Sequence, residues 1–151
     1  MKFFRKPLIN AAITLIVSIF YAFIFILISG HMEFERVLNH TDTLNSPFWN
    51  TWSAFLRQVN MKYIGYAYMV VAGVIAILSF IRKRDYDEYQ ISILEKVFIT
   101  MGETMMLVFP IALILALSDP LYSIETIMFL VVIHWSVVLI ADFVYVIKWS
   151  K

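Results

Sequence analysis

Residues Val97 to Leu117, VFITMGETMMLVFPIALILAL, are the stretch that decides the fold. These 21 residues contain a single ionisable side chain, that of Glu103. At about 1.5 Å of rise per residue, an α-helix of this length extends about 31 Å, close to the ~30 Å thickness of the hydrocarbon core of a bilayer. The stretch therefore predicts a membrane-spanning helix that carries a carboxylate.

The composition of the whole chain agrees with this prediction. Of the 151 residues, 62% are hydrophobic and 15% are charged, whereas soluble domains have roughly 45–50% apolar and 25% charged residues. A net charge of +1 without a basic stripe gives no support for direct nucleic-acid binding. The absence of cysteine excludes disulfides and thiolate metal sites, and we expect no cofactor.

Three further apolar stretches complete the expected architecture. The predicted spans are residues 8–29, 63–81, 97–117 and 121–147. The fold class is therefore an all-α polytopic membrane protein with four transmembrane helices, and nothing divides residues 1–151 into more than one domain.

Polar residues of the first span share one helical face. Asn10, Thr14, Ser18 and Tyr21 are spaced by four, four and three residues. This spacing predicts that they point toward other helices rather than toward lipid.

The connection between the first two spans contains a short amphipathic helix in its second half. Ser46 and Pro47 mark its start. Trp49, Trp52 and Phe55 recur at helical spacing, with Asn50, Ser53 and Arg57 on the opposite face. The helix is expected to lie at the outer membrane interface; alternatively, it is the protruding start of the second span.

Basic residues set the expected orientation. Nine Lys and Arg residues lie near the two termini and the linker after the second span, and three lie on the opposite side. By the positive-inside rule, both termini and that linker are predicted to be cytoplasmic.

Two carboxylates lie inside the predicted spans. Glu103 and Asp142 are about 9 Å and 7.5 Å from the cytoplasmic ends of their helices. The same inner half contains other polar side chains, and His134 is on the flank of the fourth span that carries Asp142. The candidate intramembrane polar cluster therefore comprises Glu103, Asp142, Asn10, Thr14, Thr100 and His134.

Three interpretations of this cluster remain open. Two facing carboxylates can share a proton or hold a cation. They can instead be hydrogen-bonded to hydroxyls or reach cytoplasmic water. They can also line a groove for a basic group of a partner or for a lipid headgroup.

Other ionisable residues are interpreted structurally. A lone membrane histidine such as His134 is more often packed than a ligand, and the set His31, Glu33, Glu35 and His40 has no diagnostic metal spacing. Glu125 is in the first turn of its helix, where the helix dipole favours a carboxylate.

The layout resembles the small four-span bacterial membrane proteins that accompany LytTR-type transcription regulators and hold them inactive. The similar features are a basic start, the linker ending ISILEKVFIT, the proline at Pro110, and the last span FLVVIHWSVVLIADFVYVIKWSK. The resemblance implies a non-enzymatic protein of the bacterial cytoplasmic membrane whose cytoplasmic face binds a regulator.

We therefore expect a membrane protein that acts by binding a partner protein. It would bind a cytosolic or membrane protein at its cytoplasmic face through residues of one linker, namely Arg82, Lys83, Arg84, Asp85, Asp87 and Glu88. One alternative is a small, oligomeric proton- or cation-coupled transporter or channel that uses Glu103 and Asp142. Another is an immunity-type or lipid-binding protein that uses the Trp-rich outer helix. No hydrolase or nucleotide-binding motif is present, so an enzyme is not expected.

Overall fold

All regular structure that the computed structural model describes, in residues 5–31, 46–81, 84–118 and 123–149, is helical. Four helices are long and apolar enough to cross a membrane: α1 (Pro7–Leu27), α4 (Met61–Ile81), α5 (Glu88–Ser118) and α6 (Ser123–Lys148). The prediction of an all-helical protein with four such helices is confirmed.

The helix α5 is longer than the apolar stretch from which it was predicted. It begins at Glu88, nine residues before Val97. Its start is capped reciprocally: the Asp87 carboxylate accepts a hydrogen bond from the Gln90 backbone N–H at 2.8 Å, and the Gln90 side chain accepts one from the Asp87 N–H at 3.1 Å. This capping box fixes the beginning of the helix, and α5 then continues without a break through Pro110.

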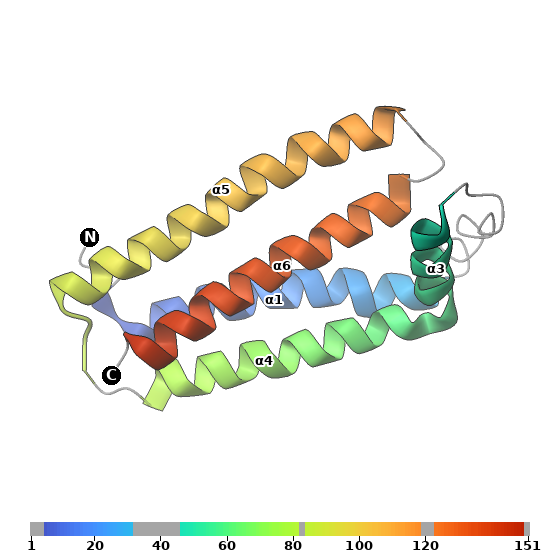
Figure 1. The fold of residues 1–151 in the computed structure, drawn as a ribbon. Coiled ribbons are helices and arrows are strands. Elements are labelled where there is room, and N and C mark those ends of the chain that lie inside the picture. The colour runs from blue at the N-terminus through green and yellow to red at the C-terminus, as the bar shows by residue number, and fades with distance from the viewer. Residues whose placement is uncertain (1–4, 32–45, 82–83, 119–122, 150–151) are drawn as a thin grey trace.

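The four long helices form two closely packed pairs. The helix α1 lies along α4, and α5 lies along α6, while α6 also contacts α1 and α4 (Figure 1). The start of α1, the end of α4, the start of α5 and the end of α6 are at one end of the bundle, and the end of α5 and the start of α6 are at the other. As a result, α5 has one main neighbour, α6, and is at the edge of the bundle.

Small residues explain the close approach of α1 and α4. Ala72 and Ala76 of α4 and Ala22 of α1 are buried. Gly65 is also buried, and a Cβ at that position would lie 2.8 Å from Cγ1 of Ile26. Such small side chains let two helix backbones approach closely in a membrane, where close packing is a main source of association.

The short helix α3 (Pro47–Phe55) is joined to α4 by a π-helical turn, Leu56–Asn60. The backbone is thus helical from Pro47 to Ile81, but α3 lies across the end of the bundle instead of along its axis (Figure 1). The predicted short helix is therefore present, and it is continuous with the helix that follows it. Its predicted position at the outer membrane interface stays a prediction.

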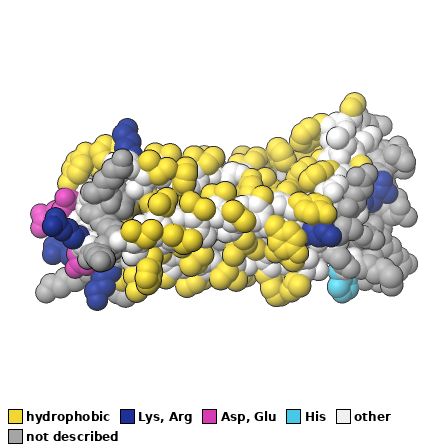
Figure 2. Space-filling model, turned by 90° about the horizontal axis from the view of Figure 1, so that it is seen from below, with side chains coloured by type: hydrophobic (Ala, Val, Ile, Leu, Met, Phe, Trp, Pro, Cys, Tyr) yellow, Lys and Arg dark blue, Asp and Glu magenta, His cyan; other side chains and the backbone are white. Residues whose placement is uncertain are grey.

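The surface has the polarity expected of a membrane protein. On the face shown in Figure 2, hydrophobic side chains cover the middle of the molecule, and charged side chains are found near its two ends. Exposed apolar side chains such as Phe20, Val70 and Phe80 are at least 65% accessible. In water such a surface would cause aggregation, whereas in lipid it is the expected exterior.

The glycines of α4 provide a test of the α1–α4 contact. We expect Gly65→Ala to lower the free energy of unfolding by about 1–3 kcal/mol, because the added methyl group must displace Ile26. Gly73 is the matched control, since a Cβ there meets no atom within 4 Å. Gly73→Ala should leave stability unchanged or raise it, as alanine favours helix over glycine. Unfolding in mixed detergent micelles measures both, and equal effects would contradict the proposed close contact.

Candidate functional site

A row of hydrogen bonds joins α1 to α6, and we call it the polar ladder. It consists of Asn10, Thr14, Ser18 and Tyr21 on α1 and Asp142, Trp135 and His134 on α6. The four α1 residues are the ones whose spacing predicted a shared face toward other helices. That prediction is confirmed, and α6 is the helix they contact.

Asp142 is at one end of the polar ladder. Its side chain is fully buried. Oδ1 accepts a hydrogen bond from the Asn10 amide at 2.7 Å, and Oδ2 accepts one from the Thr14 hydroxyl at 2.5 Å. Both carboxylate oxygens therefore have neutral donors, which compensates part of the cost of burying this group.

Trp135 and His134 form the other half of the polar ladder. The indole N–H of Trp135 donates to the Ser18 hydroxyl at 3.2 Å, and both residues are fully buried. Nδ1 of His134 is 2.5 Å from the Tyr21 hydroxyl, and Nε2 is 3.3 Å from the Met101 carbonyl oxygen. A carbonyl only accepts, so Nε2 carries a hydrogen; in the neutral imidazole the Tyr21 hydroxyl then donates to Nδ1. His134 thus links α1, α6 and α5, and both its nitrogens are occupied.

The predicted intramembrane cluster is only partly assembled. The structure brings Asn10, Thr14 and Asp142 together, whereas His134 is eight residues from Asp142, about 12 Å along α6. Thr100 is exposed, and its hydroxyl bonds to the carbonyl of Lys96 on its own helix.

The predicted cluster included Glu103, and the structure contradicts this. Its side chain is exposed on α5 and does not face Asp142. The residues of α5 that are at least partly covered on the α6 side include Leu94, Met101 and Val108. At 100° per residue, Glu103 is about 140–180° around the helix from them. The two carboxylates also lie at different levels of the bundle, because Met101, two residues before Glu103, contacts His134, which is about 12 Å along α6 from Asp142. The predicted similarity in depth is therefore wrong. This arrangement does not support a site in which both carboxylates share a proton or cation.

A second buried polar group, at the α3 end of the bundle, was not predicted from the sequence. Glu125 is fully buried, and its Oε1 accepts a hydrogen bond from the Ser53 hydroxyl at 2.9 Å. The Trp52 indole N–H donates to the Glu125 backbone oxygen, also at 2.9 Å. Glu125 therefore does more than complement the helix dipole, because it attaches α3 to the start of α6. The signal available in the sequence is Ser53, a hydroxyl directly after Trp52, but the helical spacing alone places it on the polar face of α3.

The aromatic side chains of α3 pack against the bundle. Trp49 and Trp52 make edge-to-face contacts with Phe129 of α6 at centroid distances of 6.1 and 5.8 Å, and Phe55 stacks on Trp52 at 5.7 Å. Trp52 and Phe55 also contact the hydrophobic core. These rings are thus used at least in part for internal packing.

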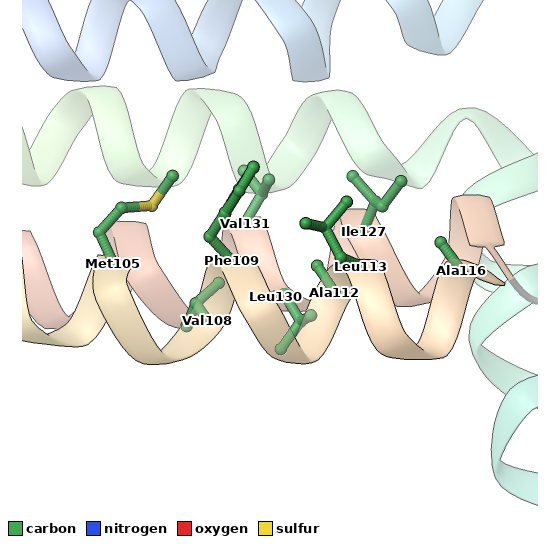
Figure 3. Close-up of a pocket in the computed structure, with 9 residues that line it drawn as sticks. All are labelled: Met105, Val108, Phe109, Ala112, Leu113, Ala116, Ile127, Leu130 and Val131. Carbon is green, nitrogen blue, oxygen red and sulfur yellow. The ribbon is translucent and has the colours of Figure 1, made fainter. Parts of the chain in front are cut away.

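An apolar crevice of about 220 Å³ separates α5 from α6 in the half of the pair nearer their connecting turn. Figure 3 shows side chains of both helices around it. Its lining consists of Met105, Val108, Phe109, Ala112, Leu113, Ala116, Ile127, Leu130 and Val131. No polar side chain lines the crevice, so it suits hydrocarbon rather than an ion or a polar substrate.

Three chain segments meet at the opposite end of the bundle. The Tyr86 backbone N–H donates to the Arg5 carbonyl at 2.7 Å, and the Tyr86 side chain is 2% exposed. The Gln90 amide donates to the Trp149 carbonyl at 2.8 Å, and the Tyr145 hydroxyl donates to the Gln90 carbonyl at 3.2 Å. We call this the clamped end, comprising residues 5–6, 84–90 and 145–149.

The clamped end contains four of the six residues predicted to bind a partner. Arg84, Asp85, Asp87 and Glu88 are exposed there. Glu88 lies 3.7 Å from the guanidinium of Arg5, in a solvent-exposed ion pair. Arg82 and Lys83 are outside the described residues.

No group of three His, Asp or Glu side chains suited to a metal ion occurs within the described part of the chain. Of the loose metal-like set in the sequence, His31 is exposed. Glu33, Glu35 and His40 are outside the described residues.

The polar ladder predicts different roles for two threonines. We expect Thr14→Val to lower the free energy of unfolding by about 1 kcal/mol, because it removes a donor from buried Asp142 while keeping the side-chain shape. Thr100→Val is the matched control, since that hydroxyl is exposed and bonds only within α5. Unfolding of both variants in mixed micelles measures the effect, and a loss as large for Thr100→Val would contradict the role assigned to Thr14.

Comparisons with protein-family models, with curated proteins and with solved structures find no match for this chain. The resemblance to the membrane partners of LytTR-type regulators therefore stays a prediction.

Proposed function

We propose that this chain is a non-enzymatic integral membrane protein that acts by binding a protein partner at its clamped end. The main support for the proposal is the position of Tyr86. Its ring is buried, and its backbone N–H donates a hydrogen bond to the Arg5 carbonyl, so that this part of the α4–α5 linker is held against the rest of the bundle. Charged side chains on either side of Tyr86 are exposed. A linker held in this way presents those charges with little loss of conformational entropy on binding.

Hydrogen bonds at the clamped end support this interpretation. Gln90 both caps α5 and donates to Trp149, so the start of α5 and the end of α6 are fixed relative to each other. Ring contacts add to this, since Tyr86 packs edge-to-face on Tyr145 with centroids 5.6 Å apart. These contacts form a fixed base under Asp85, Asp87 and Glu88.

The buried polar groups favour an interaction protein over an enzyme. Asp142 and His134 are the acidic and the basic side chain of the polar ladder, and each is hydrogen-bonded at two atoms to residues of other helices. A catalytic acid, base or ligand needs an accessible atom beside a pocket, whereas the crevice between α5 and α6 has an apolar lining. The polar ladder is therefore assigned to helix association.

The proposed orientation places the clamped end in the cytoplasm. The excess of Lys and Arg residues near the termini and the α4–α5 linker supports it, and the start of α1 and the end of α6 lie at that end of the bundle (Figure 1). A cytosolic regulator, the partner class implied by the resemblance, would then have direct access to the exposed charges. The membrane that the resemblance implies is the bacterial cytoplasmic membrane.

The orientation can be tested directly because the chain has no cysteine. We expect single cysteines introduced as Lys6→Cys and Asp85→Cys to react with a membrane-impermeant maleimide only after the cells are opened. Thr51→Cys, exposed on α3 at the other end, should react in intact cells. The opposite pattern, or labelling of Lys6→Cys and Asp85→Cys from different sides, would contradict the proposed orientation.

The binding surface can be tested with a photo-crosslinking amino acid. We expect the residue at Asp85 or Glu88 to cross-link to a discrete protein in the native membrane, and the same residue at Thr51 to give no such product. Simultaneous replacement of Arg82, Lys83 and Arg84 by Glu should abolish the product by reversing the charge of the linker. Equal cross-linking from Thr51, or a product unaffected by charge reversal, would refute this location of the surface.

A further inference from the structure

One face of α5 is covered by no other part of the described chain, and we call it the outward stripe. Its residues recur every three or four positions, which places them on one side of the helix. They are Ile99, Glu103, Met106, Pro110, Ile114 and Leu117. Met106 is 76% and Leu117 is 80% accessible, so the stripe faces directly away from α6.

Glu103 lies deep within the membrane-spanning part of this stripe. The Met101 carbonyl contacts His134, which is in the middle third of α6. Glu103 is two residues further along α5, about 3 Å by helix rise. The nearest charged residue toward the start of the helix is Lys96, seven residues or about 10 Å away. The carboxylate is therefore near the level of the buried His134, but on the outside of the bundle.

A carboxylate in this position is costly. Lipid provides neither a counter-ion nor a hydrogen-bond donor, and ionisable residues inside membranes almost always face a bundle interior or a water-filled cavity. Protonation would remove the charge but leave a polar donor and acceptor in hydrocarbon. Within the described part of the chain, no hydrogen bond or ion pair offsets this cost at Glu103.

The described spans of this chain contain no suitable cation to pair with this carboxylate. Within the described helices, Lys and Arg occur near the ends of spans or at Lys96, and none is at the depth of Glu103. Among the described residues, His134 is the only histidine at this level, and both its nitrogens are hydrogen-bonded within the bundle. A second copy, with its α5 in the same orientation, would bring one Glu103 against another. Charge complementarity thus favours a different protein.

We propose that the outward stripe binds a transmembrane helix of another protein, and that a Lys or Arg side chain near the middle of that helix pairs with Glu103. Gly102, beside Glu103, has no atom within 4 Å of the position that a Cβ would occupy. The helix surface at Gly102 is thus uncovered by the rest of the described chain. The apolar residues along the rest of the stripe would supply the van der Waals contacts of such a helix pair.

The proposal goes beyond the surface at the clamped end, since it concerns a contact inside the membrane. The two surfaces are on different parts of α5 and can be changed separately. One partner that has both a membrane span and a cytosolic domain could use both.

The test uses the full chain in phosphatidylcholine vesicles, with a donor fluorophore on a cysteine introduced at Lys6. The probes are synthetic leucine-rich helices of about 20 apolar residues that carry an acceptor and have either lysine or leucine at the centre. We expect the central-lysine helix to bind about tenfold more tightly than the leucine helix, as energy transfer would show. Glu103→Leu and Glu103→Gln should both lose this preference, because neither retains the negative charge.

The controls separate the contribution of the Glu103 charge to binding from that of the apolar residues of the outward stripe. Met106→Leu, on the same stripe and of similar volume, should keep the preference. Equal binding of the two probes to the wild-type chain, or a preference that survives Glu103→Leu, would overturn the proposal. Pairing of two copies through Glu103 that the central-lysine helix does not displace would also overturn it, in favour of self-association. Cross-linking from Asp85 should persist in Glu103→Leu, so this inference and the function proposed for the clamped end can fail independently.

Discussion

The hydrogen bonds from Asn10 and Thr14 to Asp142 are the interaction on which the arrangement of the helices depends. In lipid, apolar attraction between helices is weak because the surrounding chains are equally apolar, so close packing and polar contacts determine which faces meet. A buried carboxylate restricts these choices further. Any rotation of α1 that moved both donors away would leave Asp142 in a dry interior without partners, which is costly. The orientation of α1 about its axis is thus fixed against α6.

The contact within the α1–α4 pair differs in kind from the contact between the two helix pairs. Small residues bring α1 against α4, and Gly65 is in contact distance of the side chain of Ile26. The pairs then meet across larger side chains, with Trp135 fully buried between Ser18, Phe25 and Tyr68. Because α5 contacts mainly α6, its remaining surface is available to lipid or to another helix. His134 provides a polar link from the polar ladder to α5, at the level where that surface carries Glu103.

The number and approximate extent of the long helices could be predicted from the sequence because length and polarity alone define a span. The polar face of α1 could be predicted because a helix fixes the angle between successive residues. Helix pairing could not be predicted in the same way. The predicted depths of Glu103 and Asp142 suggested a shared site, but only the choice of α6 as the neighbour of α5 shows that Glu103 points outward. The spacing of α3 likewise places Ser53 on the polar face, because nothing in the sequence shows that its hydrogen-bond partner is Glu125 of another helix.

The contrast between the two membrane carboxylates is itself informative. Asp142 has neutral donors on both oxygens and no accessible atom, so its interactions are completed by folding. Glu103 is exposed on α5, and the covered side of that helix packs against α6. A substitution to an apolar residue would relieve the cost at Glu103 without disturbing any contact of the described chain, whereas the same change at Asp142 would leave two buried donors unsatisfied. A costly group that folding does not require is best explained by an interaction that forms after folding. The exposed carboxylate therefore points to association, and the buried one to the fold.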